Sequence, residues 1–263
     1  SFLKFESHNN QKGKAMKNLF SVKGKVIILT GGSGFLGSQF KRHLTSCGAK
    51  VVIFDNQAKN PVEITNPEDV KKAVDKTWKG YKRIDGLVHV AAINAVPGSE
   101  TSKNFWKPYE KYPLELWKKE LDVNLTAAHV VTQAVAPVMM EKKDGSIVFL
   151  ASDLAVIAPN NSIYQKGNFK DIAYVTSKTG LLGLMRSWAS YLGKYNIRVN
   201  AAVPGGMYNG QAQDFVNKNS ALNMLGRMAR KDEYNGVIQF LLSDASSYMT
   251  GASLIVDGGR TAW

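Results

Sequence analysis

The sequence has a single cysteine, Cys47, so no disulfide can form within the chain. It also has no uninterrupted run of about 18 apolar residues, the length that a membrane-spanning helix requires. The first residues lack the apolar core of a secretory signal. An unpaired thiol suits a reducing compartment. We therefore expect a cytoplasmic protein with no membrane partner.

Acidic residues are scarce, with 21 Asp and Glu against 34 Lys and Arg, which gives a net charge of +13. A basic surface can steer anionic substrates or nucleic acid, or it can simply be a lysine-rich solvated surface. The basic residues are scattered rather than blocked, which favours the solvated surface and no nucleic-acid partner. Lysines without periodicity predict a flexible lead-in over residues 1–22, in which residues 1–15 precede a plausible natural start at Met16.

What is present suits one α/β domain over residues 23–263, large enough to fold without a disulfide or a metal. Short apolar runs alternate with helical patterns along the chain, and most of the runs are apolar on both faces. This alternation predicts a Rossmann-like, doubly wound parallel sheet of about seven strands with helices on both faces. The expected strands are 26–29, 51–54, 86–91, 147–150, 197–203 and 253–256, and the expected helices are 36–46, 67–79, 114–140, 172–193 and 231–243.

Three glycines, Gly31, Gly34 and Gly37, lie between the first expected strand and the first expected helix. Glycines there allow a pyrophosphate to approach the backbone, and the helix N-terminus supplies unpaired N–H donors. Asp55 ends the second strand, where a carboxylate accepts hydrogen bonds from ribose hydroxyls and repels a 2′-phosphate. The pattern predicts NAD as cofactor and NADP as the less favoured one, although Lys59 lies close by in sequence.

Tyr174 and Lys178 lie four residues apart in a helical segment and therefore share one face. Of ten tyrosines, Tyr174 alone has Lys at the fourth position after it. Ser152 follows a strand at the edge where parallel sheets bind ligands. Asn124 is a polar residue inside an apolar helix, which invites a hydrogen-bonding role. Residues 204–206, Pro-Gly-Gly, place a tight turn at the same edge.

These segments resemble the short-chain dehydrogenase/reductase family over residues 24–259. The matching pieces are TGGSGFLG (30–37), DVNL (122–125), GSIVFLAS (145–152), YVTSK (174–178), NIRVNAAVPGG (196–206) and LIVDGG (254–259). The resemblance implies a catalytic tetrad of Asn124, Ser152, Tyr174 and Lys178. We assign cofactor binding to Gly31, Ser33, Gly34, Phe35, Leu36, Gly37, Asp55, Glu63, Ile64, Ala91, Ala92, Tyr174, Lys178, Pro204, Gly205 and Gly206, and no residue to a metal.

The physical chemistry supports those roles. A tyrosine has a reference pKa near 10, which a neighbouring Lys178 and an oxidised nicotinamide both lower. Tyr174 would take the proton from a substrate hydroxyl as hydride leaves the carbon, or return it in reduction. Ser152 would hydrogen-bond the substrate oxygen, Lys178 would hold the nicotinamide ribose, and Asn124 would position a water.

The sequence departs from the family in three places. The spacing in TGGSGFLG is typical of the family's extended members, yet the chain ends too soon after residue 259 for their larger C-terminal domain. The usual N-N-A-G after the third strand reads His89-Val90-Ala91-Ala92, and we expect His89 in or near that strand. The stretch between Ser152 and Tyr174 is longer than usual and resembles members of bacterial sugar-modification and surface-glycan pathways.

Two loop inserts, 94–113 and 153–171, and a lid over 207–228 are expected to shape the substrate mouth. The candidate substrate contacts are Asn160, Tyr164 and Met207, and beyond them Ser162, Trp106 and Tyr109. Each of the loop residues among these can instead pack its loop onto the domain. Arg227 is expected to anchor the lid.

The leading hypothesis is an NAD-dependent oxidoreductase that interconverts an alcohol and a ketone on a polar, carbohydrate-like substrate. A 3-ketoacyl (acyl carrier) reductase is the enzymatic alternative, and a non-catalytic dinucleotide-sensing protein is the alternative of another class. The family resemblance implies a homotetramer or a homodimer. The sequence does not decide the physiological direction of the reaction.

Overall fold

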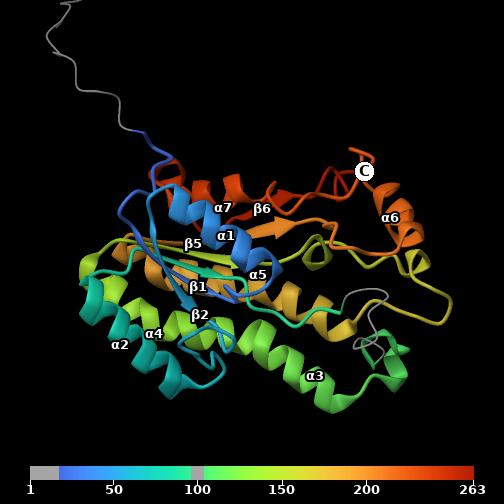
Figure 1. Cartoon of the computed structure of the whole chain (residues 1–263), viewed down its shortest axis with the longest axis horizontal. Coiled ribbons are helices and arrows are strands. Elements are labelled where there is room, and N and C mark those ends of the chain that lie inside the picture. The colour runs from blue at the N-terminus through green and yellow to red at the C-terminus, as the bar shows by residue number, and fades with distance from the viewer. Residues whose placement is uncertain (1–17, 96–103) are drawn as a thin grey trace, which may run out of the picture.

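The computed structural model describes residues 18–95 and 104–263 (Figure 1). Six parallel strands form one sheet in the order β2-β1-β3-β4-β5-β6. The predicted Rossmann-like α/β fold is confirmed, although the described residues hold six strands instead of about seven. Every expected apolar run became a strand: β1 (Val26–Thr30), β2 (Lys50–Phe54), β3 (Gly86–His89), β4 (Gly145–Leu150), β5 (Ile197–Pro204) and β6 (Ser253–Val256).

Helices cover both faces of this sheet, as Figure 1 shows. On one face, α1 (Phe35–Ser46) and α7 (Asn235–Leu242) pack Phe40 and Ile238 against the sheet. On the other, α2 (Pro67–Tyr81), α4 (Ala127–Lys142) and α5 (Ile172–Leu192) form the second core. Strands that are buried on both faces explain why their sequences are continuous apolar runs without alternation.

The expected helix over 114–140 is one continuous helical segment from Leu114 to Lys142, built of α3 (Leu114–Leu121), a π-helical turn (Asp122–Thr126) and α4. By length and composition alone this segment is apolar enough to cross a membrane. However, Val131, Val135 and Met139 are fully buried in the protein core. A core helix of a globular domain passes the same test, so the segment needs no membrane to explain its apolar residues.

Several boundaries differ from expectation, and β3 ends at His89 instead of residue 91. The predicted lid contains a helix, α6 (Gln213–Ser220), and α7 begins at Asn235 instead of near residue 231. The predicted lead-in extends too far, because Val22 is fully buried and the Phe20 carbonyl accepts a hydrogen bond from Gln239. The remainder of that lead-in, with Met16, and residues 96–103 of the first insert lie outside the described residues.

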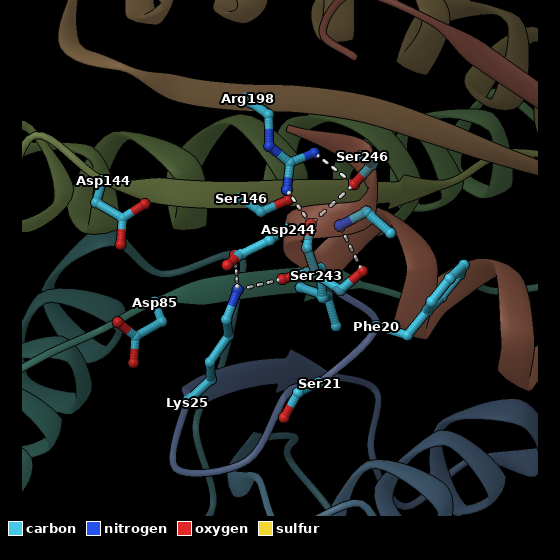
Figure 2. A network of polar contacts seen from close by, with 12 residues as sticks. Phe20, Ser21, Lys25, Asp85, Asp144, Ser146, Arg198, Ser243, Asp244 and Ser246 are labelled. Atoms are coloured by element: carbon cyan, nitrogen blue, oxygen red, sulfur yellow. Dashed lines mark hydrogen bonds and ion pairs between the residues drawn. The ribbon is translucent and has the colours of Figure 1, made fainter. Parts of the chain in front are cut away.

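Charged side chains make hydrogen bonds and an ion pair at the end of the sheet where the strands begin, as Figure 2 shows. Lys25, just before β1, donates from Nζ to the Leu242 carbonyl (2.8 Å) and pairs with Asp244 (3.3 Å). Arg198 in β5 donates to Ser246 Oγ at 2.8 Å. These contacts join the start of β1 and β5 to the residues at and just after the end of α7. The polar groups named here therefore have their bonding partners within the protein.

Candidate active site

The opposite edge, where the parallel strands end, opens into a cavity of about 720 Å³. Ligands of open α/β sheets bind at this edge. Residues from the ends of β1 to β5 and from α3 and α5 line the cavity. Its walls include many of the residues predicted from the sequence: Gly31, Gly34, Phe35, Leu36, Gly37, Asp55, Glu63, Ile64, Ala91, Ala92, Tyr174, Lys178, Pro204 and Met207.

The glycine turn leaves no room for side chains. Gly31 has a φ of +66°, and a Cβ there would lie 2.7 Å from Ala91 Cα. A Cβ on Gly37 would lie 2.0 Å from the Gly31 carbonyl oxygen. Helix α1 then begins at Phe35, with Gly34 as an N-cap that has no side chain to accept from the helix and with no acidic residue in the first turn. Its N-terminal N–H groups and dipole are therefore available to a phosphate, and the turn fits a dinucleotide.

Asp55 joins this turn to the end of β2. Its Oδ2 accepts from the Ser33 N–H at 2.9 Å and its Oδ1 from the Gln57 N–H at 2.8 Å. Each carboxylate oxygen retains a further acceptor position, which suits the two hydroxyls of an adenosine ribose. Glu63 also lies on the cavity wall, but its Oε1 is bonded by the Thr65 N–H and hydroxyl. Those hydrogen bonds hold the pKa of Glu63 below its ordinary value.

His89 is the last residue of β3 and is fully buried. The Thr30 hydroxyl accepts from the N–H groups of Val90 and Ala91, so its hydrogen is directed to His89 Nδ1 at 3.0 Å. Burial, with Lys178 nearby, lowers the pKa of His89 to about 3. The imidazole is therefore neutral, and the Thr30–His89 pair braces the edge where the family's asparagine is missing.

Asn124 is fully buried in the π-helical turn. Its Oδ1 accepts from the Ile93 N–H (2.7 Å), and its Nδ2 donates to the Ile93 carbonyl (3.0 Å) and to Ser177 Oγ (3.2 Å). A π-bulge in a helix often marks a functional position. Here the amide clamps the loop after β3, which lines the cavity, and links it to α5.

Helix α5 positions the predicted catalytic pair. Asp171 caps the helix by accepting from the Tyr174 N–H at 3.1 Å. One turn later, Lys178 Nζ lies 5.6 Å from the Tyr174 ring centre and donates to the Leu150 carbonyl at 2.6 Å. Ser152, just past β4, lies close enough to Tyr174 to lower the pKa of the tyrosine hydroxyl. Three of the four predicted tetrad residues therefore converge where β4 meets α5.

Burial sets the charge state of this group. Desolvation raises the pKa of Tyr174, and its hydrogen bond with Ser152 acts in the opposite direction. Desolvation, followed by the nearby charge of Lys170, lowers the pKa of Lys178 to about 7. The tyrosine is thus a phenol in the protein alone. An oxidised nicotinamide bound beside Tyr174 would add a positive charge that favours the phenolate, and it would supply the hydride chemistry.

Sequence reasoning missed three charged residues at this site. Lys170 Nζ lies 4.2 Å from the Tyr174 ring centre and donates to Asn94 Oδ1 at 2.9 Å. Burial lowers the pKa of Lys170 to about 8. Asp153 and Arg260 form a buried ion pair beside Ser152. The spacing of four residues from Lys170 to Tyr174 was a usable signal, but no local pattern brings Arg260 to Asp153.

Aromatic side chains from the two inserts and the predicted lid pack together. The Tyr164 ring lies 5.4 Å from that of Trp106 and 5.5 Å from that of Phe215 in α6, so the predicted lid packs on the second insert, which in turn packs on the first. Among the predicted substrate contacts, Met207 lines the cavity, whereas Asn160 bonds the Ser162 N–H and hydroxyl of its own turn. Asn160 therefore stabilises its own turn by accepting these two hydrogen bonds.

The lid is fixed at its base. Met207 pairs with Ala229 across the base, and Arg227 makes two 2.7 Å contacts with the Glu233 carboxylate, as expected of an anchor. Gly205 packs against Asp257, so a Cβ there would lie 2.8 Å from Asp257 Cα. Of the other predicted cofactor residues, Ser33, Gly205 and Gly206 do not line the main cavity; Gly206 lines a smaller neighbouring one.

Comparison with known proteins places this geometry in a family. Residues 13–261 match the family model described as "Enoyl-(Acyl carrier protein) reductase". A 3-oxoacyl-[acyl-carrier-protein] reductase of Thermotoga maritima is 30% identical over 90% of this chain and 98% of its own. The ribulose-forming D-arabinitol 2-dehydrogenase of Candida albicans is also 30% identical, over 93% of this chain and 95% of its own.

A solved structure gives the same result. The short-chain dehydrogenase of Leptospira borgpetersenii with bound NAD⁺ superimposes with a TM-score of 0.84 at 28% identity, covering 97% of this chain and all of that one. The match extends over nearly the full length of both chains. The chain therefore belongs to the short-chain dehydrogenase/reductase family of NAD(P)-dependent oxidoreductases that act on CH–OH groups.

Proposed function

We propose that this enzyme uses NAD to interconvert a secondary alcohol and a ketone on a polar, polyol-like substrate, with Tyr174 transferring the proton. The observation that carries the proposal is that Tyr174 and Lys178 line the cavity that begins at the glycine turn, with Ser152 close to Tyr174. In oxidation the Tyr174 oxygen takes the hydroxyl proton as hydride leaves the same carbon, and in reduction it returns it. Lys178 would favour the phenolate and would hold the nicotinamide ribose.

Asp55 supports the preference for NAD over NADP. Its carboxylate closes the turn by bonding the Ser33 N–H, so a 2′-phosphate would meet a negative charge at the ribose edge. We expect NADH to bind at least tenfold more tightly than NADPH in a fluorescence titration, and Asp55→Asn to narrow that ratio. Tighter binding of NADPH by the unaltered protein would overturn the preference.

The composition of the mouth supports a polar substrate. Asn94, Asn209, Lys119 and Asp122 line the cavity together with its apolar residues. The similarity to an arabinitol dehydrogenase points the same way. A panel of sugar alcohols, sugar phosphates and nucleotide sugars, followed through NADH absorbance, tests the class. Tyr174→Phe should lower kcat by at least about 10²-fold while NADH still binds.

A 3-ketoacyl reductase is the second candidate, favoured by the similarity to the Thermotoga maritima acyl-carrier reductase. Acetoacetyl thioesters belong in the same panel as the polyols. Turnover of thioesters with no turnover of any polyol would establish this alternative. If NADH binds but the physiological activity survives Tyr174→Phe, the protein is instead a non-catalytic dinucleotide sensor.

We also propose a homotetramer or a homodimer. Ile255, Leu225 and Trp263 expose 44%, 67% and 72% of their surface, and contact with a second copy of the chain would cover such apolar side chains. Light scattering of the purified protein tests this, and a monomeric mass would contradict it.

A further inference from the structure

The residue after the catalytic serine is a buried carboxylate that contacts the serine directly. Asp153 Oδ1 accepts from the Ser152 hydroxyl at 2.8 Å and from the Leu154 N–H at 2.9 Å. The Asp153 side chain is 7% exposed. A buried carboxylate is costly unless it is paired, so its retention beside the reacting group calls for a role.

Its partner comes from the far end of the chain. Arg260 follows β6, and its Nε lies 3.1 Å from Asp153 Oδ2, with an exposed side-chain fraction of 6%. Among the described residues, Arg260 Nε makes no aligned hydrogen bond, so the pair is held by charge. The Gly258-Gly259 turn before Arg260 is fixed by Asp257, whose Oδ1 accepts from the Gly259 N–H at 2.9 Å.

The Ser152 hydroxyl has one hydrogen and two acceptor positions. One acceptor position receives the Leu154 N–H at 3.2 Å. The hydrogen is directed to Asp153, since a carboxylate can only accept. The same hydrogen would stabilise an ionised Tyr174, because a hydrogen bond from Ser152 lowers the pKa of the tyrosine. Were the tyrosine ionised, its oxygen would compete with Asp153 for the same hydrogen.

We propose that Asp153, held by Arg260, is a positioning residue that takes the Ser152 hydrogen and so keeps Tyr174 as the proton-bearing member of the pair until substrate binds. The inference rests on the proposed function in one respect, that Ser152 and Tyr174 are the reacting pair. It gives the C-terminal segment a part in the chemistry, because Arg260 keeps Asp153 ionised.

Several charged or titratable groups face Asp153 from the elements around it, and all bear on its effect. Arg260 and Asp257 come from the segment after β6, and Tyr234 precedes α7. Tyr164 comes from the second insert, and Lys170 and Tyr174 from the start of α5. Burial raises the pKa of Asp153 and Arg260 opposes this, whereas the charge of Asp153 raises the pKa of Tyr174.

The direct test follows the ionisation of Tyr174 by NMR with ¹³Cζ-labelled tyrosine, from pH 6 to 11 in protein saturated with NAD⁺, with Tyr174→Phe to assign the signal. Asp153→Asn keeps the shape and removes the charge. We expect the Tyr174 midpoint to fall by about one pH unit, a tenfold larger ratio of phenolate to phenol at a given pH. If the Tyr174 titration curves of the unaltered protein and of Asp153→Asn were identical from pH 6 to 11, whether or not an ionisation is seen in that range, the proposal would be overturned.

Arg260 provides an independent arm. Arg260→Gln leaves the buried Asp153 without a cation, so Asp153 should take up a proton and lose its charge. We therefore expect the Tyr174 midpoint to fall, as it does in Asp153→Asn. Arg260→Lys should return the midpoint most of the way to that of the unaltered protein. The double variant Asp153→Asn/Arg260→Gln should shift no further than Asp153→Asn alone, because both changes act through one carboxylate. Additive shifts would contradict the coupling. This arm also keeps the proposal testable if one of the single variants does not fold.

Asp85→Asn is the matched control, because Asp85 is another buried, ion-paired carboxylate at the opposite edge of the sheet. It should lower stability and leave the Tyr174 midpoint in place. The outcome is separable from that of the proposed function. Turnover of polyols with an unmoved Tyr174 midpoint would overturn this inference alone, and a shifted midpoint without turnover of any alcohol would overturn the proposed substrate class alone.

Discussion

Glu120 is a buried carboxyl group whose ionisation makes the stability of the fold depend on pH. It is fully buried in α3, where an apolar residue would be expected, and it is hydrogen-bonded to the Tyr112 hydroxyl. The same hydroxyl lies 2.9 Å from Asp171 Oδ1. Burial, with the neighbouring Asp171, raises the pKa of Glu120 to about 8. The carboxyl group therefore stays protonated at neutral pH.

Glu120→Gln should make the protein more stable at alkaline pH. Because the pKa is raised in the folded state, Glu120 stabilises the fold fully below its unfolded value near 4.5, and that contribution is lost as the pH rises through about 8. Glutamine copies the neutral acid without this loss. We expect no difference near pH 4.5 and a gain on the order of 1–3 kcal/mol above pH 8, in urea unfolding.

Glu115→Gln is the control for this prediction. Glu115 lies on the same helix, is exposed and pairs with Lys118 at 3.0 Å across the surface. Such pairs contribute little, so the control should reproduce the pH slope of the unaltered protein. A Glu120→Gln variant with that same slope would contradict the assignment of a buried neutral acid.

At the scale of elements, the glycine turn and the start of α1 act as one unit. Gly37→Ala should abolish dinucleotide binding, because its Cβ would lie 2.0 Å from the Gly31 carbonyl and force helix and turn apart. Gly80→Ala in α2 meets nothing within 4 Å. It should stabilise the protein by about 0.5–1 kcal/mol and leave NADH binding intact. NADH fluorescence and thermal melting of both variants test these two predictions. Normal NADH binding by Gly37→Ala would contradict the claim that the turn and the start of α1 act as one unit.

Sequence reasoning succeeded where one element carries its own pattern. Fully buried strands give continuous apolar runs, and the glycine turn, Asp55 and the Tyr174–Lys178 spacing are each local, so they could be placed without the structure. It failed at α6, which is polar with only one buried residue, Asn219, and is held by packing on the second insert. Asp153 and Arg260 were missed because only the tertiary fold brings them together.

At the scale of the whole molecule, the two edges of the sheet have different tasks. Where the strands end, N–H groups, carboxylates and lysines face a large cavity. Where they begin, Asp85 is enclosed: Oδ2 accepts from the Val26 N–H (2.8 Å) and from Arg83 (2.7 Å), and Lys142 pairs with Oδ1. This separation predicts that the two edges can be altered independently, one for stability and the other for binding.

Asp85→Asn tests that separation. Burial alone would raise the pKa of Asp85, but hydrogen bonds from Arg83 and Lys142 hold it below the ordinary value. Its contribution is therefore present above pH 3.8 and is lost as the pH falls through the lowered folded value. We expect a loss of roughly 3 kcal/mol at pH 7, because two cations are left without their buried partner, and a smaller loss below about pH 4. NADH should bind within about twofold of the unaltered protein, because the strands between the edges are rigid and fully paired. If NADH affinity instead fell in step with stability, the edges would be coupled through the sheet, and the division of tasks would fail.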